Sequence, residues 1–248
     1  MSSSLTLITG GTRGIGAATA RRLAAAGHDL VLGYHRDDQA AARTVAEVEA
    51  LGRRCVAVST DLGAPDGIDD LYAAAAELGR LTAVINNAGA TLRLAPLAET
   101  PVDIIRRTID INLTAAVLVA RTAVRTLGRS YGGNGGVIVN VSSAAATLGS
   151  PDEYVYYAAA KAGVDALTLG LSKEVGRDGI RVVGVAPGLV RTDIHASAGD
   201  ASRLERIAPT VPLERAGEPE EIADVIAWAV SDAASYVTGS TVRVAGGR

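Results

Sequence analysis

The chain has 248 residues with 24 basic and 27 acidic side chains, and this net charge of −3 argues against a highly basic nucleic-acid-binding protein or a polybasic membrane anchor. A hydrophobic fraction of 48% with 21% charged residues is typical of a globular protein. The single cysteine, Cys55, excludes an internal disulfide, and the three histidines are too far apart in sequence to indicate a metal site.

Seven short aliphatic runs recur along the chain and predict β-strands. Most are apolar throughout and do not alternate with polar residues, which is typical of strands buried on both faces of a parallel sheet. The runs are residues 5–9, 30–33, 55–59, 81–86, 137–141, 181–186 and 241–245.

The segments between these strands are rich in alanine and have helical periodicity. Thr100 is predicted to cap a helix that has Pro101 in its first turn, and glycines follow three other helices at positions 27, 52 and 79. Alternating strands and helices predict an α/β fold: one Rossmann-like, doubly wound parallel sheet of about seven strands with helices on both faces. We expect residues 1–248 to form a single domain, with 188–217 as a substrate-binding loop or lid.

The first predicted strand leads into a glycine-rich turn, Thr9-Gly10-Gly11-Thr12-Arg13-Gly14-Ile15-Gly16, which is followed by a helix. Glycines there allow a tight turn and let backbone N–H groups at the helix N-terminus approach a pyrophosphate. The alternative is a plain strand-to-helix connection. The position of the glycine-rich turn after the first strand favours a dinucleotide-binding site.

The residues at the end of the second strand indicate which dinucleotide, NAD or NADP, the site would bind. An NAD site usually has Asp or Glu there, whereas this chain has His35 and Arg36, and Arg13 lies in the glycine turn. Guanidinium groups bind phosphate oxygens through paired donors, so the sequence predicts NADP(H). The alternative is that both arginines are solvated surface charges.

Tyr157 and Lys161 are one helical turn apart, and Lys161 is one of only two lysines in the chain, with Lys173. A neighbouring ammonium favours the phenolate, so we expect a lowered pKa of Tyr157 and a role in proton transfer. The alternative is an ordinary surface contact. Ser142 and Ser143 follow the 137–141 strand, where a hydroxyl can bind a substrate carbonyl or cap the next segment.

Taken in order, these motifs resemble the short-chain dehydrogenase/reductase family over essentially the whole chain. The matching elements are residues 9–16, Asp61-Leu62, residues 86–89, Asn112, Ser143, Tyr157 with Lys161, Pro187-Gly188 with Thr192, residues 236–239 and residues 244–247.

The resemblance implies four catalytic residues. Tyr157 is the general acid that protonates the carbonyl oxygen, and Lys161 lowers its pKa and binds the nicotinamide ribose. Ser143 polarises the carbonyl, and Asn112 holds a water that links Lys161 to a proton path.

The resemblance also implies a cofactor site without metal. Asp61 and Leu62 flank the adenine, and residues 187–192 close over the nicotinamide. The implied cofactor-binding residues are Gly10, Thr12, Arg13, Gly14, Ile15, Gly16, His35, Arg36, Asp61, Leu62, Asn87, Ala88, Gly89, Tyr157, Lys161, Pro187, Gly188, Val190 and Thr192.

The sequence departs from the family pattern beside the catalytic tyrosine. Thirteen residues separate Ser143 from Tyr157, one more than the common spacing, which leaves Ser142 open as the catalytic serine. Tyr154 and Tyr156 have no lysine four residues later, so we expect them to shape the substrate pocket or to pack.

These features predict an NADPH-dependent oxidoreductase that reduces a ketone to a secondary alcohol. Alternatives are a 3-oxoacyl-carrier-protein reductase, for which Arg125 and Arg129 are candidate basic residues, a sugar or alcohol dehydrogenase, and a non-catalytic NADP(H)-sensing regulator. A hydrolase is excluded because there is no Gly-x-Ser-x-Gly elbow, and a Walker ATPase because neither lysine follows a glycine.

The predicted partner is a small-molecule carbonyl compound, with no nucleic acid and no membrane. The longest uncharged run, residues 130–151, is interrupted by glycines, and no basic residue precedes Arg13, so we expect a cytoplasmic protein. Apolar residues on several faces of the helices starting near Pro101 and Tyr154 predict a homotetramer or dimer.

Overall fold

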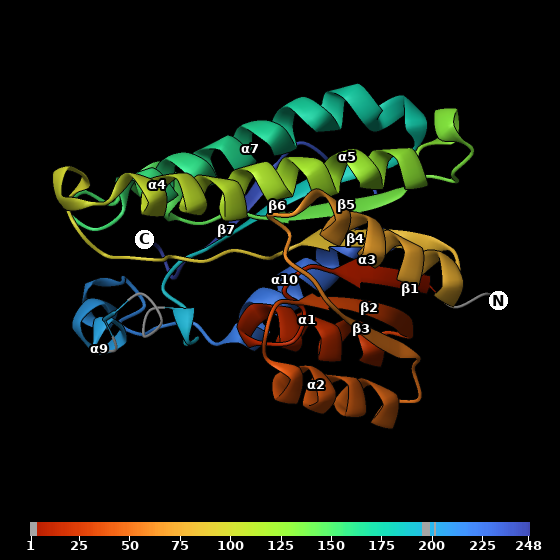
Figure 1. Ribbon diagram of the computed structural model, residues 1–248, viewed down its shortest axis with the longest axis horizontal. Helices are drawn as coiled ribbons and strands as arrows, with labels where there is room; N and C mark the ends of the chain where they lie inside the picture. The colour runs from red at the N-terminus through yellow and green to blue at the C-terminus, as the bar shows by residue number, and fades with distance from the viewer. Residues whose placement is uncertain (1–3, 195–198, 201) are drawn as a thin grey trace.

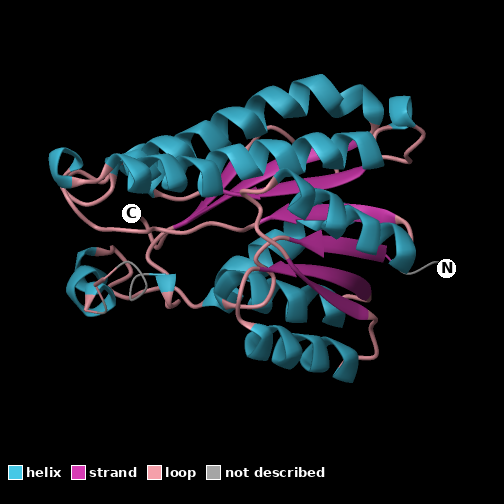
Figure 2. Cartoon of the chain, in the orientation of Figure 1, coloured by secondary structure: helices cyan, strands magenta, loops and turns pink. Residues whose placement is uncertain are grey.

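The computed structural model describes residues 4–194, 199–200 and 202–248. Its centre is a seven-stranded sheet in which every neighbouring pair is parallel, in the order β3-β2-β1-β4-β5-β6-β7 (Figures 1 and 2). The strands are β1 (Ser4–Ile8), β2 (His28–Tyr34), β3 (Cys55–Ser59), β4 (Leu81–Asn86), β5 (Gly136–Val141), β6 (Ile180–Pro187) and β7 (Thr241–Val244). The predicted doubly wound sheet is confirmed.

Helices cover both faces of the sheet. Figure 1 shows α4, α5 and α7 on one side of the strands and α1 and α2 on the other. One face packs against α1 (Gly14–Ala25), α2 (Asp38–Ala50) and α10 (Pro219–Val230). The other packs against α3 (Pro65–Leu78), α5 (Ala115–Leu127) and α7 (Val155–Val175).

The central strands are largely apolar because alternate residues enter two different cores, whereas the edge strands β3 and β7 are partly exposed. In β5, Val137, Val139 and Val141 pack into the core shared with α1 and α10, whereas Ile138 packs into the core shared with α3 and α5. Each such buried side chain contributes about 1.5–3 kcal/mol to folding. Burial on both faces therefore explains why the strands lack a polar alternation.

The helix predicted from Pro101 differs from the expectation in two ways. α4 (Val102–Ile109) begins one residue later than predicted, because Pro101 is extended at the cap position and the Thr100 hydroxyl donates to the carbonyl of Pro96 at 3.0 Å. The helix is also not regular: a π-helical turn, Asp110–Thr114, joins α4 to α5.

The segment 188–217 leaves the sheet after β6 and returns before α10. Its base is closed by a bridge between Val190 and Gly217, and the N–H of Arg191 donates to the Gly217 carbonyl at 2.9 Å. It contains the short helix α9 (Arg203–Ile207) and a small apolar cluster around Val211. Residues 195–198 and 201 of this predicted lid lie outside the described residues.

Two kinds of feature are absent from the described part of the chain. No helix in it is long and apolar enough to cross a membrane. Within the same residues, no group of three His, Cys, Asp or Glu side chains is placed to hold a metal ion.

Candidate active site

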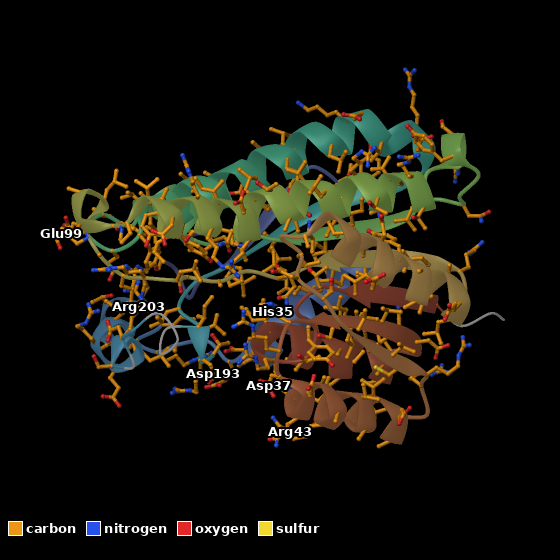
Figure 3. All side chains as sticks on the ribbon, in the orientation of Figure 1. His35, Asp37, Arg43, Glu99, Asp193 and Arg203 are labelled. Atoms are coloured by element: carbon orange, nitrogen blue, oxygen red, sulfur yellow. The ribbon has the colours of Figure 1, made fainter. Side chains whose placement is uncertain are left out.

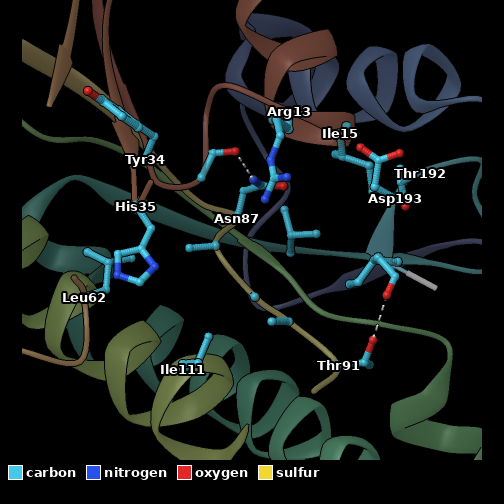
Figure 4. A pocket seen from close by; sticks show the side chains of 18 of the residues that line it. Arg13, Ile15, Tyr34, His35, Leu62, Asn87, Thr91, Ile111, Thr192 and Asp193 are labelled. Atoms are coloured by element: carbon cyan, nitrogen blue, oxygen red, sulfur yellow. Dashed lines mark hydrogen bonds between the residues drawn. The ribbon is translucent and has the colours of Figure 1, made fainter. Parts of the chain in front are cut away.

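A cleft of about 850 Å³ opens at the carboxyl ends of the strands, where β1 separates the part of the sheet that continues to β2 from the part that continues to β4 (Figure 4). Ligands bind at this switch point in open α/β sheets. The predicted residues that line it are Gly10, Thr12, Arg13, Gly14, Ile15, Gly16, His35, Arg36, Asp61, Leu62, Asn87, Ala88, Gly89, Ser143, Tyr157, Lys161, Pro187, Gly188, Val190 and Thr192.

The glycine-rich turn forms one wall of this cleft at the N-terminus of α1. α1 begins at Gly14, its cap residue Arg13 does not cap it with a side chain, and its first turn contains no acidic residue. The N–H groups in the first turn of a helix have no hydrogen-bond partner within that helix, and in α1 this turn lies at the cleft. A Cβ on Gly16 would lie 2.0 Å from the carbonyl oxygen of Gly10, so only glycine fits this approach. These residues fit a dinucleotide pyrophosphate.

The end of the cleft next to the carboxyl end of β2 contains both predicted arginines. Arg36 is exposed, and within the described residues it forms no ion pair, whereas Arg13 lies 3.9 Å from Asp37. Sequence reasoning missed two acidic residues there, although an Asp before a helical run is a recognisable cap signal. Asp37 accepts a hydrogen bond from a first-turn N–H of α2 at 2.9 Å, and Asp38 accepts one from the Tyr34 hydroxyl at 2.9 Å. Both carboxylates therefore have partners within the protein.

Tyr157 and Lys161 lie on consecutive turns of α7 and line the same cleft. Both side chains are buried, and the Lys161 ammonium is 5.8 Å from the centre of the Tyr157 ring. That ammonium donates to the carbonyl oxygen of Val141, at the end of β5, at 2.8 Å. The pair is therefore not an ordinary surface contact.

Burial dominates the electrostatics of this pair. It raises the pKa of Tyr157 above its usual range, and a side-chain hydrogen bond with Ser143 opposes the shift. Burial also lowers the pKa of Lys161 to about 8, against the opposing charge of Asp165. The expected lowering of the Tyr157 pKa is thus wrong for this structure, because burial of the phenol raises this pKa more than the hydrogen bond with Ser143 lowers it. Tyr157 is a protonated phenol at neutral pH.

The two serines after β5 point to different places. Ser142 is buried, and its hydroxyl donates to the backbone carbonyl of Lys161 at 3.1 Å. Ser143 lines the cleft as a partner of Tyr157, and its hydroxyl also accepts from the N–H of Ala145 at 3.1 Å. The geometry favours Ser143 as the residue that meets a substrate.

Asn112 lies behind the cleft wall in the π-helical turn and is 1% exposed. Its amide donates to the carbonyl oxygens of Ala90 at 2.8 Å and Thr108 at 2.9 Å, and its oxygen accepts from the Ala90 N–H at 3.2 Å. A Cβ on Gly89 would lie 2.7 Å from this oxygen and 3.3 Å from the Lys161 nitrogen. Gly89 thus separates Asn112 from Lys161, and π-turns of this kind are frequent at functional sites.

Tyr154 and Tyr156 have different environments. Tyr154 lines the cleft, and its ring meets that of Tyr157 edge to face, with centroids 5.2 Å apart and an angle of 89°. The Tyr156 hydroxyl instead donates to the backbone carbonyl of Arg93 at 2.5 Å, and its side chain packs beneath α4. Only Tyr154 of these two belongs to the pocket, while Tyr156 has a packing role.

Several residues of the cleft have no sequence signal in the motifs above. They are Gln39, Thr60, Gly63, Arg107 and Ile111, whereas Asp193 and Ile194 belong to the predicted substrate-binding segment 188–217. Thr91 donates from its hydroxyl to the carbonyl of Ile194 at 3.3 Å, which joins the loop after β4 to the segment after β6 across the cleft (Figure 4). No periodicity or motif identifies such contacts, because they depend on tertiary placement.

Arg125 and Arg129 do not line the cleft, contrary to the idea that they surround the entrance. α5 starts beside the cleft and runs against the strand direction, and β5 begins a short loop after α5 ends. The two arginines, near the end of α5 and before β5, therefore lie toward the amino ends of the strands and away from the cleft.

Comparison with known proteins gives consistent matches over nearly the full length. Residues 10–248 match the family model described as enoyl-(acyl carrier protein) reductase. The chain is 40% identical to the uncharacterized oxidoreductase YgfF of Escherichia coli, covering 98% of this chain and 99% of that one. It is 38% identical to an L-rhamnose 1-dehydrogenase (NAD(P)(+)) of a Sphingomonas species, covering 97% and 94%. A short-chain dehydrogenase from Burkholderia cenocepacia, solved in complex with NADP, superimposes with a TM-score of 0.90 at 33% identity, covering 98% and 97%.

Proposed function

Since the chain belongs to the short-chain dehydrogenase/reductase family and is an oxidoreductase of CH–OH and C=O groups, we propose that it reduces a ketone to a secondary alcohol with NADPH. The observation that supports this most directly is the meeting of Ser143, Tyr157 and Lys161 at one cleft with the open N-terminus of α1. A hydroxyl, a protonated phenol and an ammonium there supply polarisation, a proton and positive charge.

The cofactor would be held along the whole cleft. First-turn N–H groups of α1 would bind the pyrophosphate, and Asp61 and Leu62 would flank the adenine. Arg36 and Arg13 would bind a 2′-phosphate, which supports NADP(H) because the nearby Asp37 has its own partners. When bound, the nicotinamide supplies the hydride.

The protein's own residues then supply position and one proton. Ser143 donates a hydrogen bond to the substrate carbonyl oxygen, and Tyr157, neutral at pH 7, protonates that oxygen as the carbon is reduced. Lys161 uses one ammonium N–H on Val141, and its two other N–H groups remain for the cofactor ribose and for stabilising the phenolate that forms. Asn112 would hold a water molecule that links Lys161 to a proton path.

In this proposal, residues 1–248 act as one cofactor-binding unit, and segment 188–217 covers the substrate. A second copy of the chain is expected on α5 and α7, where Val117, Leu118 and Leu169 are 38–48% exposed despite being apolar. Light scattering that gives the mass of a dimer or tetramer supports this assembly, and a stable monomer contradicts it.

The decisive experiment is a screen for NADPH oxidation with ketones, 3-oxoacyl thioesters and oxidised sugars. We expect turnover with at least one ketone, with NADPH preferred over NADH. Stoichiometric NADPH binding without oxidation across the panel would instead favour the NADP(H)-sensing regulator.

A further inference from the structure

A buried arginine of segment 188–217 contacts the residues immediately before α7. Arg203, the first residue of α9, is 3% exposed, and one of its terminal nitrogens donates to the carboxylate of Glu153. The other terminal nitrogen donates to the hydroxyl of Tyr154 at 2.8 Å, and the guanidinium carbon is 5.2 Å from the centre of the Tyr154 ring. Figure 3 labels Arg203 above the short helix α9. A buried cation is costly unless paired, so Glu153 fixes where this guanidinium lies.

This contact determines how the hydroxyl of Tyr154 can be used. A guanidinium has donors and no acceptor, so the oxygen of Tyr154 must accept from Arg203. The O–H proton of Tyr154 then needs a different partner, and within the described residues this hydroxyl donates no hydrogen bond. Two residues later, Tyr156 shows the contrast, because its O–H donates to the carbonyl of Arg93.

The unused donor belongs to a side chain that lines the cleft beside the proposed acid. Tyr154 lies at the start of α7, and its ring packs edge to face on Tyr157 at 5.2 Å. The N–H of Ala95 donates to the carbonyl of Glu153 at 2.7 Å, which holds the loop that leads into Tyr154. Tyr154 therefore lies beside the position at which a substrate carbonyl would meet Tyr157.

We propose that Tyr154 is a specificity-determining hydrogen-bond donor for a second oxygen on the carbon next to the reacting carbonyl, with Arg203 as its positioning residue. The substrate class is then hydroxyketones, diones and related sugar carbonyls, in preference to simple ketones. This inference rests on the proposed ketone reduction. The positive charge of Arg203 also makes the phenol a stronger donor, since hydrogen bonds next to an ionised group are stronger than neutral ones.

The test compares 3-hydroxybutan-2-one with butan-2-one, which differ by one hydroxyl. The wild type should have a kcat/KM at least about tenfold higher for the hydroxyketone, since sites built to bind a substrate hydroxyl discriminate strongly against analogues without it. Tyr154→Phe should lose roughly tenfold or more on the hydroxyketone and less than about threefold on butan-2-one. A purely structural role of Tyr154 would lower both values equally.

Two further variants test the part played by the arginine. Arg203→Lys retains the charge but loses the two-armed contact, so the preference for the hydroxyketone should fall, with circular dichroism confirming that the variant is folded. Arg215→Leu is the matched control, because Arg215 is an exposed arginine of the same segment that bonds Glu221 at 2.6 Å and does not line the cleft. It should leave the substrate preference unchanged.

The outcomes separate this inference from the proposed function. Equal losses on both substrates in Tyr154→Phe, no loss on either, or a wild type that does not prefer the hydroxyketone would overturn the role of Tyr154 while ketone reduction stands. If none of the carbonyl compounds supports NADPH oxidation by the wild type, the proposed function is overturned, and this inference with it.

Discussion

The ammonium of Lys161 donates a 2.8 Å hydrogen bond to the backbone carbonyl of Val141, and this bond joins α7 to the end of β5. α7 carries Tyr157, and Ser143 is two residues after Val141 in the chain. The bond is buried, so it holds the proposed acid and the proposed carbonyl-binding hydroxyl in fixed relation. Lys161 thus has a structural contact in addition to its proposed role with the cofactor.

Lys161→Met gives a pH-dependent change in stability. Burial lowers the pKa of Lys161 from 10.5 to about 8, so between these values the unfolded chain binds a proton that the folded protein lacks. The unfolding free energy of the wild type relative to Lys161→Met should therefore rise by about 2 kcal/mol between pH 7 and pH 10. Denaturant unfolding without nucleotide measures it. Lys173→Met, at an exposed position of the same helix, is the control. A difference that is constant or falls with pH contradicts the burial of a charged Lys161.

The two serines after β5 should differ in their effect on kcat. Ser143→Ala should lower kcat by roughly 10- to 100-fold, because it removes a donor to the carbonyl, and it also loses the oxygen that accepts from the Ala145 N–H. Ser142→Ala should leave kcat within a few-fold but reduce stability by about 1 kcal/mol, because it removes the hydrogen bond to the Lys161 carbonyl. Kinetics and thermal unfolding of both variants check this. The reverse pattern would identify Ser142 as the catalytic serine.

Sequence patterns predict this fold well because the strands are buried on both faces. The predicted and observed limits agree for β3 and β4 and differ by at most two residues elsewhere. The glycines at helix C-termini were equally informative. Gly27 and Gly52 follow α1 and α2 with φ of +95° and +74°, a region that favours glycine.

Features that depend on tertiary burial were not accessible from sequence. The π-turn around Asn112 follows from side-chain bonds to Ala90, a residue 22 positions away, and no local propensity specifies it. The direction of the Tyr157 pKa shift depends on solvent exclusion, which the Tyr-x-x-x-Lys spacing does not report. Arg203 reads as one of many surface arginines until α9 is placed against Tyr154.

Arg36→Ala and Arg13→Ala test the cofactor preference. Each should raise the KM for NADPH by roughly tenfold or more and change the KM for NADH by less than about threefold, because only NADPH carries the 2′-phosphate that these guanidiniums would bind. Arg43→Ala is the control, since Arg43 is exposed on α2 and does not line the cleft. A clear catalytic advantage for NADH in the wild type would contradict the preference.

The most direct test of the account compares the wild type with Tyr157→Phe for NADPH oxidation with a ketone that the wild type reduces. The substitution keeps the buried ring and removes only the O–H group, so NADPH affinity, measured by fluorescence titration, should stay within about threefold. Loss of the general acid should lower turnover by at least about 100-fold. Turnover near the wild-type rate in Tyr157→Phe would remove Tyr157 as the proton donor and contradict the proposed mechanism.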